Sequence, residues 1–161
     1  MTARTLVIGM GNPDRGDDGI GPMVARRLAA QLPPGIETLE RSGDALALLD
    51  DWTGATAVIL IDAAAPLTAP GRIHRIDPAK EPLPAGLSPA STHALGVADA
   101  IALARALGRL PAHLVVFAVE GGCFDAGTAM TPAVTAAADE VIALVSLELK
   151  NLPSPTQTVS G

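Results

Sequence analysis

Thr5-Leu-Val-Ile-Gly-Met-Gly-Asn-Pro-Asp-Arg-Gly-Asp-Asp-Gly-Ile-Gly21 is the stretch around which the chain is organised. It opens with the apolar run Leu6 to Ile8, which is typical of a strand in a sheet that is covered on both faces. Gly9 and Gly11 follow, and they allow backbone angles and close approaches that a Cβ would block. The stretch therefore predicts a buried strand that ends in a tight loop.

A helix is predicted directly after this loop. Asp17 and Asp18 stand where the helix begins, and Pro22 falls in its first turn. Apolar residues spaced four apart predict a stripe that faces the core: Ile20, Val24 and Leu28. The pattern places carboxylates at the carboxyl end of a central strand. For Asp17 we interpret the carboxylate as a helix cap, because such side chains usually accept the free amides of a first turn.

The chain has 161 residues, and we expect one domain over residues 1–150. The remaining segment, 151–161, is rich in Pro, Ser and Thr and is predicted to be a disordered tail.

The charge and the aromatic content exclude nucleic acid as a partner. There are 11 basic and 17 acidic residues, a net charge of -6, and only two Phe, one Trp and no Tyr. The longest strongly apolar runs, such as Leu110 to Val119, are shorter than the roughly 20 residues that cross a bilayer, so no membrane association is expected. The single cysteine, Cys123, and the absence of room for a signal peptide before the first strand predict a cytoplasmic protein.

The rest of the chain alternates between strand and helix patterns. After the first strand, further strands are expected over 36–39, 57–61 and 114–119, and an edge strand over 72–76. Helices are expected over 18–31, after a cap at Ser42, from Ser91 or Thr92 to 107, and from Thr131-Pro132 onward. The helix that ends at 107 is expected to be buried on most sides. This order predicts an α/β three-layer sandwich, in which helices cover both faces of a mostly parallel twisted sheet of about five strands.

Three side chains are expected to meet at the carboxyl edge of this sheet. Asp18 follows the first strand, Asp62 follows the strand over 57–61, and His93 stands at the start of the long helix. Two carboxylates and one imidazole suit a divalent transition metal such as nickel or zinc. Each also has a structural interpretation: Asp18 as a helix cap, Asp62 as a paired buried carboxylate, and His93 as a helix N-terminal residue with a satisfied ring.

Other chemically active side chains have weaker patterns around them. We interpret His74 and His113 as surface or strand-end residues, and Cys123 as a structural or incidental cysteine. Gly9-x-Gly11 lacks the third glycine of a dinucleotide-binding turn, and the carboxylates that follow it would repel a phosphate.

Four motifs, taken in order and with their spacing, resemble those of the hydrogenase maturation proteases, the endopeptidases that trim the large subunit of nickel-iron hydrogenases. They are Gly9-Met-Gly11-Asn12 with Asp17-Asp18-Gly19-Ile-Gly21, Ile61-Asp62-Ala63, Ser91-Thr-His93-Ala-Leu-Gly96-Val-Ala-Asp99, and Gly127-Thr-Ala-Met-Thr131-Pro132. The resemblance covers about residues 4 to 149.

The resemblance implies an aspartic-type endopeptidase that acts after nickel has been inserted into the hydrogenase precursor. It implies that Asp18, Asp62 and His93 are catalytic residues that bind this nickel, and that the partner is the large-subunit precursor, which loses a C-terminal extension. Two alternatives stay open. One is a nickel-binding checkpoint or chaperone that recognises the precursor without cutting it, and the other is a nucleotide-binding enzyme of similar architecture.

Overall fold

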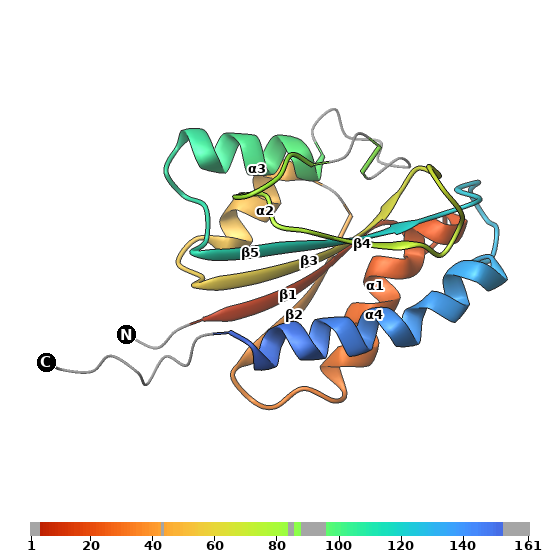
Figure 1. Cartoon of the computed structure of the whole chain (residues 1–161), viewed down its shortest axis with the longest axis horizontal. Helices are drawn as coiled ribbons and strands as arrows, with labels where there is room; N and C mark the ends of the chain where they lie inside the picture. The colour runs from red at the N-terminus through yellow and green to blue at the C-terminus, as the bar shows by residue number, and fades with distance from the viewer. Residues whose placement is uncertain (1–3, 43, 84–85, 88–95, 153–161) are drawn as a thin grey trace, which may run out of the picture.

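Five strands form a single sheet in the spatial order β2-β1-β3-β5-β4 (Figure 1). The computed structural model describes residues 4–42, 44–83, 86–87 and 96–152. The strands are β1 (Thr5–Met10), β2 (Ile36–Arg41), β3 (Ala57–Ala64), β4 (Ile73–Ile76) and β5 (His113–Glu120). Four of them run parallel, and β4 pairs antiparallel with β5 at one edge. The predicted mostly parallel sheet and its edge strand are confirmed.

The helices cover both faces of the sheet. They are the 3-10 helix η1 (Gly16–Gly19), followed by α1 (Ile20–Ala29), α2 (Ala45–Trp52), α3 (Val97–Ala106) and α4 (Pro132–Lys150). Helices α2 and α3 lie on one face, and α1 and α4 lie on the other (Figure 1). This arrangement confirms the predicted α/β three-layer sandwich.

Side-chain alternation along the strands builds two cores, one on each face. In β1, Leu6 and Ile8 pack toward α2 and α3, whereas Val7 packs toward α1 and α4. Because helices cover both faces, all eight residues of β3 are buried. The alternation also fixes the side of Asp62, which projects on the same face as Leu60, toward the layer of α2 and α3.

Two details of the predicted helices are wrong. The N-cap of α2 is Asp44, whose Oδ1 accepts the N–H of Leu46 at 2.9 Å, and not Ser42. The cap falls later because β2 continues to Arg41. Helix α3 begins at Val97 after the N-cap Gly96, so its predicted start at Ser91 or Thr92, which lie outside the described residues, is also wrong.

Helix α3 is also not buried on most sides. One face is buried, through Val97, Ala100, Ile101 and Ala104, and the opposite face is exposed. The sequence pattern was misleading because several of the apolar residues are alanines, which tolerate exposure far better than larger apolar side chains.

Within the described ranges, no helix is long and apolar enough to cross a membrane. Of the predicted disordered tail, residues 153–161 lie outside the part of the chain that the structure describes.

Candidate active site at the carboxyl edge of the sheet

Four acidic side chains are buried at the carboxyl edge of the sheet. Asp17 and Asp18 lie in η1, which follows β1, while Asp62 lies in β3 and Glu120 ends β5. None is more than 3% exposed. Because β1, β3 and β5 are neighbouring parallel strands, their carboxyl ends meet at the same edge. A buried carboxylate is costly unless it is paired, hydrogen-bonded or ligated, so the partners of each acid indicate its role.

The turn after β1 holds Asp18 in place. Gly11 has φ +139°, and a Cβ there would come within 1.9 Å of the backbone oxygen of Asp18, so only glycine fits. The next residue, Asn12, donates its backbone N–H to Asp18 Oδ2 at 2.7 Å. Local backbone geometry therefore fixes the position of this carboxylate.

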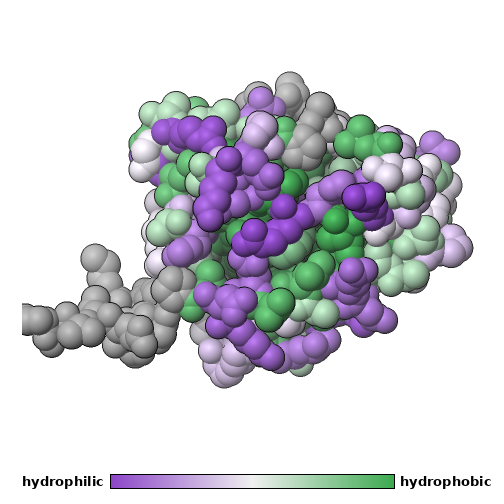
Figure 2. Space-filling model, in the orientation of Figure 1, coloured by the Kyte–Doolittle hydropathy of each residue, from purple (hydrophilic) through white to green (hydrophobic). Residues whose placement is uncertain are grey.

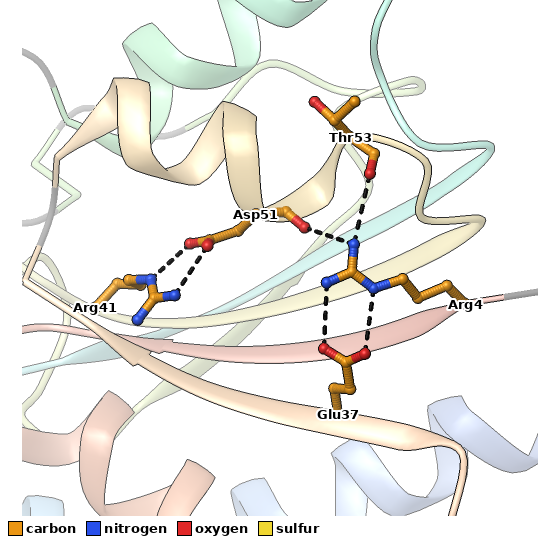
Figure 3. Close-up of polar contacts among 5 residues, drawn as sticks. All are labelled: Arg4, Glu37, Arg41, Asp51 and Thr53. Atoms are coloured by element: carbon orange, nitrogen blue, oxygen red, sulfur yellow. Dashed lines mark hydrogen bonds and ion pairs between the residues drawn. The ribbon is translucent and has the colours of Figure 1, made fainter.

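The same turn is tied to the neighbouring strand and helix. The N–H of Gly11 donates to the carbonyl oxygen of Arg41 at 2.9 Å. The guanidinium of Arg41 makes two hydrogen bonds to Asp51 in α2, at 2.6 and 2.9 Å (Figure 3). Arg4, which precedes β1, donates to the carbonyl oxygen of Asp51 (Figure 3). These contacts connect α2 and β2 to the turn that carries Asp18.

The carboxylate of Asp18 is poorly compensated. Burial raises its pKa, and the Asn12 N–H and the positive charge of Arg15 offset this effect only in part, so the pKa stays above its ordinary value. Within the described part of the chain, Asp18 accepts one side-chain hydrogen bond, which leaves oxygen lone pairs available. Such a carboxylate is suited to bind a cation.

Close packing of α1 brings η1 against β3. A Cβ on Gly21 would lie 2.3 Å from the carbonyl oxygen of Met10 and 2.6 Å from that of Ile61, so the start of α1 lies directly against β1 and β3. Helix η1 itself contacts β3. The glycine therefore places Asp18 beside the end of the strand that contains Asp62.

Asp62 lies within β3 and not after it, because the strand continues to Ala64. The side chain is 0% exposed, and its Oδ1 accepts the N–H of Ala63 at 2.9 Å. Its backbone lies opposite Ala118 of β5. The prediction that it follows a strand ending at Ile61 is wrong in this detail, although Asp62 does lie near the carboxyl end of the strand.

The predicted trio is brought together only in part. Asp18 and Asp62 share the edge, while His93 lies outside the described residues, three positions before the N-cap of α3. Among residues 4–42, 44–83, 86–87 and 96–152, no group of three or more His, Cys, Asp or Glu could hold a metal ion.

Asp17 does not cap α1, so the interpretation of this residue as a helix cap is wrong. Its Oδ2 accepts the backbone N–H groups of Gly122 and Cys123, at 2.7 and 3.1 Å. Its Oδ1 accepts the N–H of Thr131 at 2.7 Å, and the hydroxyl of Thr131 also donates to the carboxylate. Burial alone would raise the pKa of Asp17, but these hydrogen bonds outweigh it and lower the pKa. Asp17 joins η1 to the loop between β5 and α4.

Glu120 was not singled out from the sequence. It accepts the N–H groups of Leu67 and Thr68, each at 2.5 Å, and pairs with His74 Nε2 at 2.7 Å. Burial opposes ionisation, but the pairing with His74 and the two amides lower the pKa of Glu120 to about 2. The sequence did contain a signal for Glu120. This residue directly follows the apolar run over 114–119, just as Asp62 was expected to follow the strand over 57–61.

The remaining candidates have structural surroundings. His113 is exposed at the start of β5, as predicted. His74, which we expected at the surface or at a strand end, lies within β4 and is half-buried against Glu120. The thiol of Cys123 lies 3.6 Å from Asp125 Oδ2 and 3.8 Å from Thr128 Oγ1, and these contacts lie within its own loop.

The fold and the buried acids define an α/β three-layer protein with four buried carboxylates at the carboxyl edge of its sheet. A family model described as hydrogenase maturation protease matches residues 22–148. The chain therefore belongs to the hydrogenase maturation protease family and is a peptidase.

Individual relatives agree with this assignment. The hydrogenase expression/formation protein HupD of Rhodobacter capsulatus is 30% identical over 154 residues, which cover 91% of this chain and 71% of the relative. HupD of Bradyrhizobium diazoefficiens is 30% identical over an alignment of 166 residues, which covers 98% of this chain and 82% of the relative. The structure of the hydrogenase maturating endopeptidase HybD from E. coli superposes with a TM-score of 0.77 at 27% identity, covering 91% of this chain and 92% of that one.

Proposed function

We propose that this peptidase removes a C-terminal extension from the large-subunit precursor of a nickel-iron hydrogenase after nickel has been inserted. Family membership supports the class of reaction and the class of substrate. The sequence features that favour the cytoplasm, a single Cys123 among them, suit such an intracellular maturation step.

The observation that carries the proposal is the difference between the four buried acids. Asp17 and Glu120 have their oxygens occupied by several donors from the protein. Asp18 keeps unused acceptor capacity in a buried position, and its pKa is raised. A desolvated carboxylate with free lone pairs is the kind of group that a cation stabilises strongly, and Asp62 lies at the end of the adjacent strand.

In this proposal, Asp18, Asp62 and His93 contact nickel that the precursor already carries, so the ion arrives as part of the substrate. Carboxylate and imidazole ligands are appropriate for nickel. Their contact would orient the precursor so that the scissile peptide bond is held next to the ion, which can polarise the carbonyl or activate a water. Asp17 is unsuited to act as the general base, because donors occupy both of its oxygens and its pKa is lowered.

The test mixes the purified protein with the large-subunit precursor of a hydrogenase from the same organism, in nickel-loaded and nickel-free forms, and records intact masses. We expect loss of a C-terminal peptide from the loaded form only. Asp18→Asn, Asp62→Asn and His93→Ala should each abolish this loss while the fold survives. Asp139→Asn is the matched control, because Asp139 pairs with Arg27 on the exposed surface of α4, 84% exposed.

Each outcome has a distinct meaning. A precursor that binds the wild-type protein but keeps its mass would favour the checkpoint or chaperone function. Processing of the nickel-free form at the same rate would remove nickel from the mechanism. Wild-type processing by a correctly folded His93→Ala variant would remove His93 from the site.

A further inference from the structure

The outer edge of β4 lies in a groove. All four residues of the strand, Ile73 to Ile76, line a hollow of about 470 Å³. The rest of its lining comes from the neighbouring loops and from the ends of β3 and β5: Leu67, Glu81, Pro82, Leu83, Ala64, Ala118 and Glu120. Ligand pockets in proteins commonly measure about 300–1,000 Å³. Figure 2 shows hydrophobic surface between hydrophilic residues at the centre of the face where Figure 1 places β4. The groove therefore combines an apolar lining with strand backbone.

Two residues of β4 turn their backbone groups away from β5. The N–H of Glu120 donates to the carbonyl oxygen of Arg72, so this carbonyl faces β5, and the carbonyl oxygen of Glu120 accepts the N–H of Gly71. Backbone groups alternate in direction from residue to residue along a strand, so those of His74 and Ile76 face β5, and those of Ile73 and Arg75 face outward. In the sheet formed by the described residues, β4 is the last strand on that side.

The polar side chains of β4, His74 and Arg75, do not shield this edge. Proteins usually protect an exposed edge strand with charged side chains that project beside it. Here His74 pairs with the buried Glu120 on one face of the sheet, and Arg75 makes two hydrogen bonds to Glu148 of α4 on the other face. Both side chains are held against the protein's own elements, which leaves the edge accessible for backbone pairing.

A hydrophobic contact is fixed at the rim of the groove. Leu67 is 70% exposed, yet its backbone N–H is bound by Glu120, so the loop that presents it is anchored to the end of β5. Leu67 comes five residues after Asp62 along the chain. An anchored, exposed leucine beside an unpaired strand edge provides an apolar contact for a chain that pairs with that edge.

We propose that an extended segment of the hydrogenase precursor adds to the sheet as a strand beside β4 and contacts Leu67. This inference rests on the proposed function. Asp62, Ala118 and His74 lie in one row across β3, β5 and β4, so a strand added beside β4 lies three strand spacings, roughly 14 Å, from Asp62. An extended chain advances about 3.3 Å per residue, which places the docked segment at least about four residues from the bond that is cut.

The groove favours a peptide segment over a second copy of this chain. Pro82 and Leu83 line the groove beside the four-residue strand, so the edge lies in a trough that admits one extended chain. Direct pairing between two copies of β4 would need a flat and open edge. A dimer that forms through β4 would therefore overturn the proposal.

The test compares Arg75→Pro with Arg75→Ala. Both variants lose the ion pair with Glu148, but only proline also removes the outward N–H, which β5 does not use. We expect Arg75→Pro to bind the precursor at least tenfold more weakly than Arg75→Ala does, and to raise KM for the loaded precursor with little change in kcat. Equal binding by the two variants, or a wild-type dimer that Arg75→Pro dissociates, would overturn the docking strand.

Amide hydrogen exchange of the wild-type protein gives a second readout that does not depend on whether Arg75→Pro folds. Adding the precursor should slow exchange of the Ile73 and Arg75 amides at least tenfold, while His74 and Ile76 are already protected in the free protein. If exchange at Ile73 and Arg75 is unchanged while the protein still cuts the loaded precursor, the proposed docking beside β4 is refuted and the proposed function is not. A protein that cuts no precursor would instead refute the proposed function.

Discussion

Replacing Asp17 with alanine should destabilise the protein strongly, although Asp17 lies next to a proposed ligand and looks like part of the site. The carboxylate accepts three backbone N–H groups, from Gly122, Cys123 and Thr131, in addition to the Thr131 hydroxyl. A donor left without an acceptor costs about 1–3 kcal/mol. Water can reach these partly buried amides, so we take about 1 kcal/mol for each, a total of about 3 kcal/mol.

Urea unfolding measures this loss. With a slope of about 2 kcal/mol/M, the midpoint of Asp17→Ala should fall by roughly 1.5 M. Asp17→Asn keeps one acceptor oxygen but turns its NH₂ toward either Thr131 or the Gly122 and Cys123 amides, so it should lose about 1–2 kcal/mol. Asp139→Ala, which removes an exposed ion pair, should lose about 1 kcal/mol or less.

The contribution of Asp17 should also depend on pH. Because its pKa in the folded protein is lowered from 3.8, the unfolded state binds more protons just below that pH. The stabilisation is therefore complete above pH 3.8 and is lost as the pH falls through the lower folded value. A free energy of unfolding for Asp17→Ala within 0.5 kcal/mol of wild type at pH 7 would refute this account.

Three further predictions concern the same edge. Glu120→Gln should have a lower free energy of unfolding than wild type, and the difference should be largest above pH 4.5. It should shrink as the pH falls toward about 2, where Glu120 protonates in the folded protein. Urea unfolding across this pH range measures the difference. Gly11→Ala should lower the melting temperature far more than Gly35→Ala. Both glycines have positive φ, but only the Cβ at Gly11 would meet backbone, and equal losses would contradict the steric argument. Asp18→Asn should keep or raise the urea midpoint at pH 7 because it removes a buried charge, so a clear loss of stability would show that the carboxylate is structural.

Much of this fold follows from local sequence patterns. The apolar run from Leu6 to Ile8, the run over 57–61 and the alternating stretch over 72–76 each correspond to a strand. Thr131-Pro132 marks the start of α4, because proline fits the first turn of a helix. A predicted helix start is wrong where two nearby residues have a similar propensity to cap a helix. Ser42 and Asp44 are both good N-caps, and only the length of β2 decides between them.

The roles of the acids were harder to predict than their positions. The partners of Asp17 are 105 to 114 residues away along the chain, so no local pattern could distinguish its loop contacts from a helix cap. Asp62 was identified because an acid next to a buried strand requires a partner, and Asp18 because it stands at the start of the helix that follows the first strand. Glu120 also directly follows an apolar run, that over 114–119, so the same argument applies to it.

Three of the four acids at this edge are of two kinds: hydrogen bonds compensate the charges of Asp17 and Glu120 well, and that of Asp18 only in part. Asp17 anchors the loop after β5 and Glu120 anchors the loop after β3, each through several hydrogen bonds that lower its pKa. Between these anchors, the burial of Asp18 opposes ionisation. A carboxylate in such a position persists only when its surroundings are rigid. The hydrogen bonds of Asp17 and Glu120 therefore hold the loops at this edge in place. In our proposal they keep the Asp18 carboxylate in position to contact the ion that the precursor carries, and weakening them should impair the site before it unfolds the sheet.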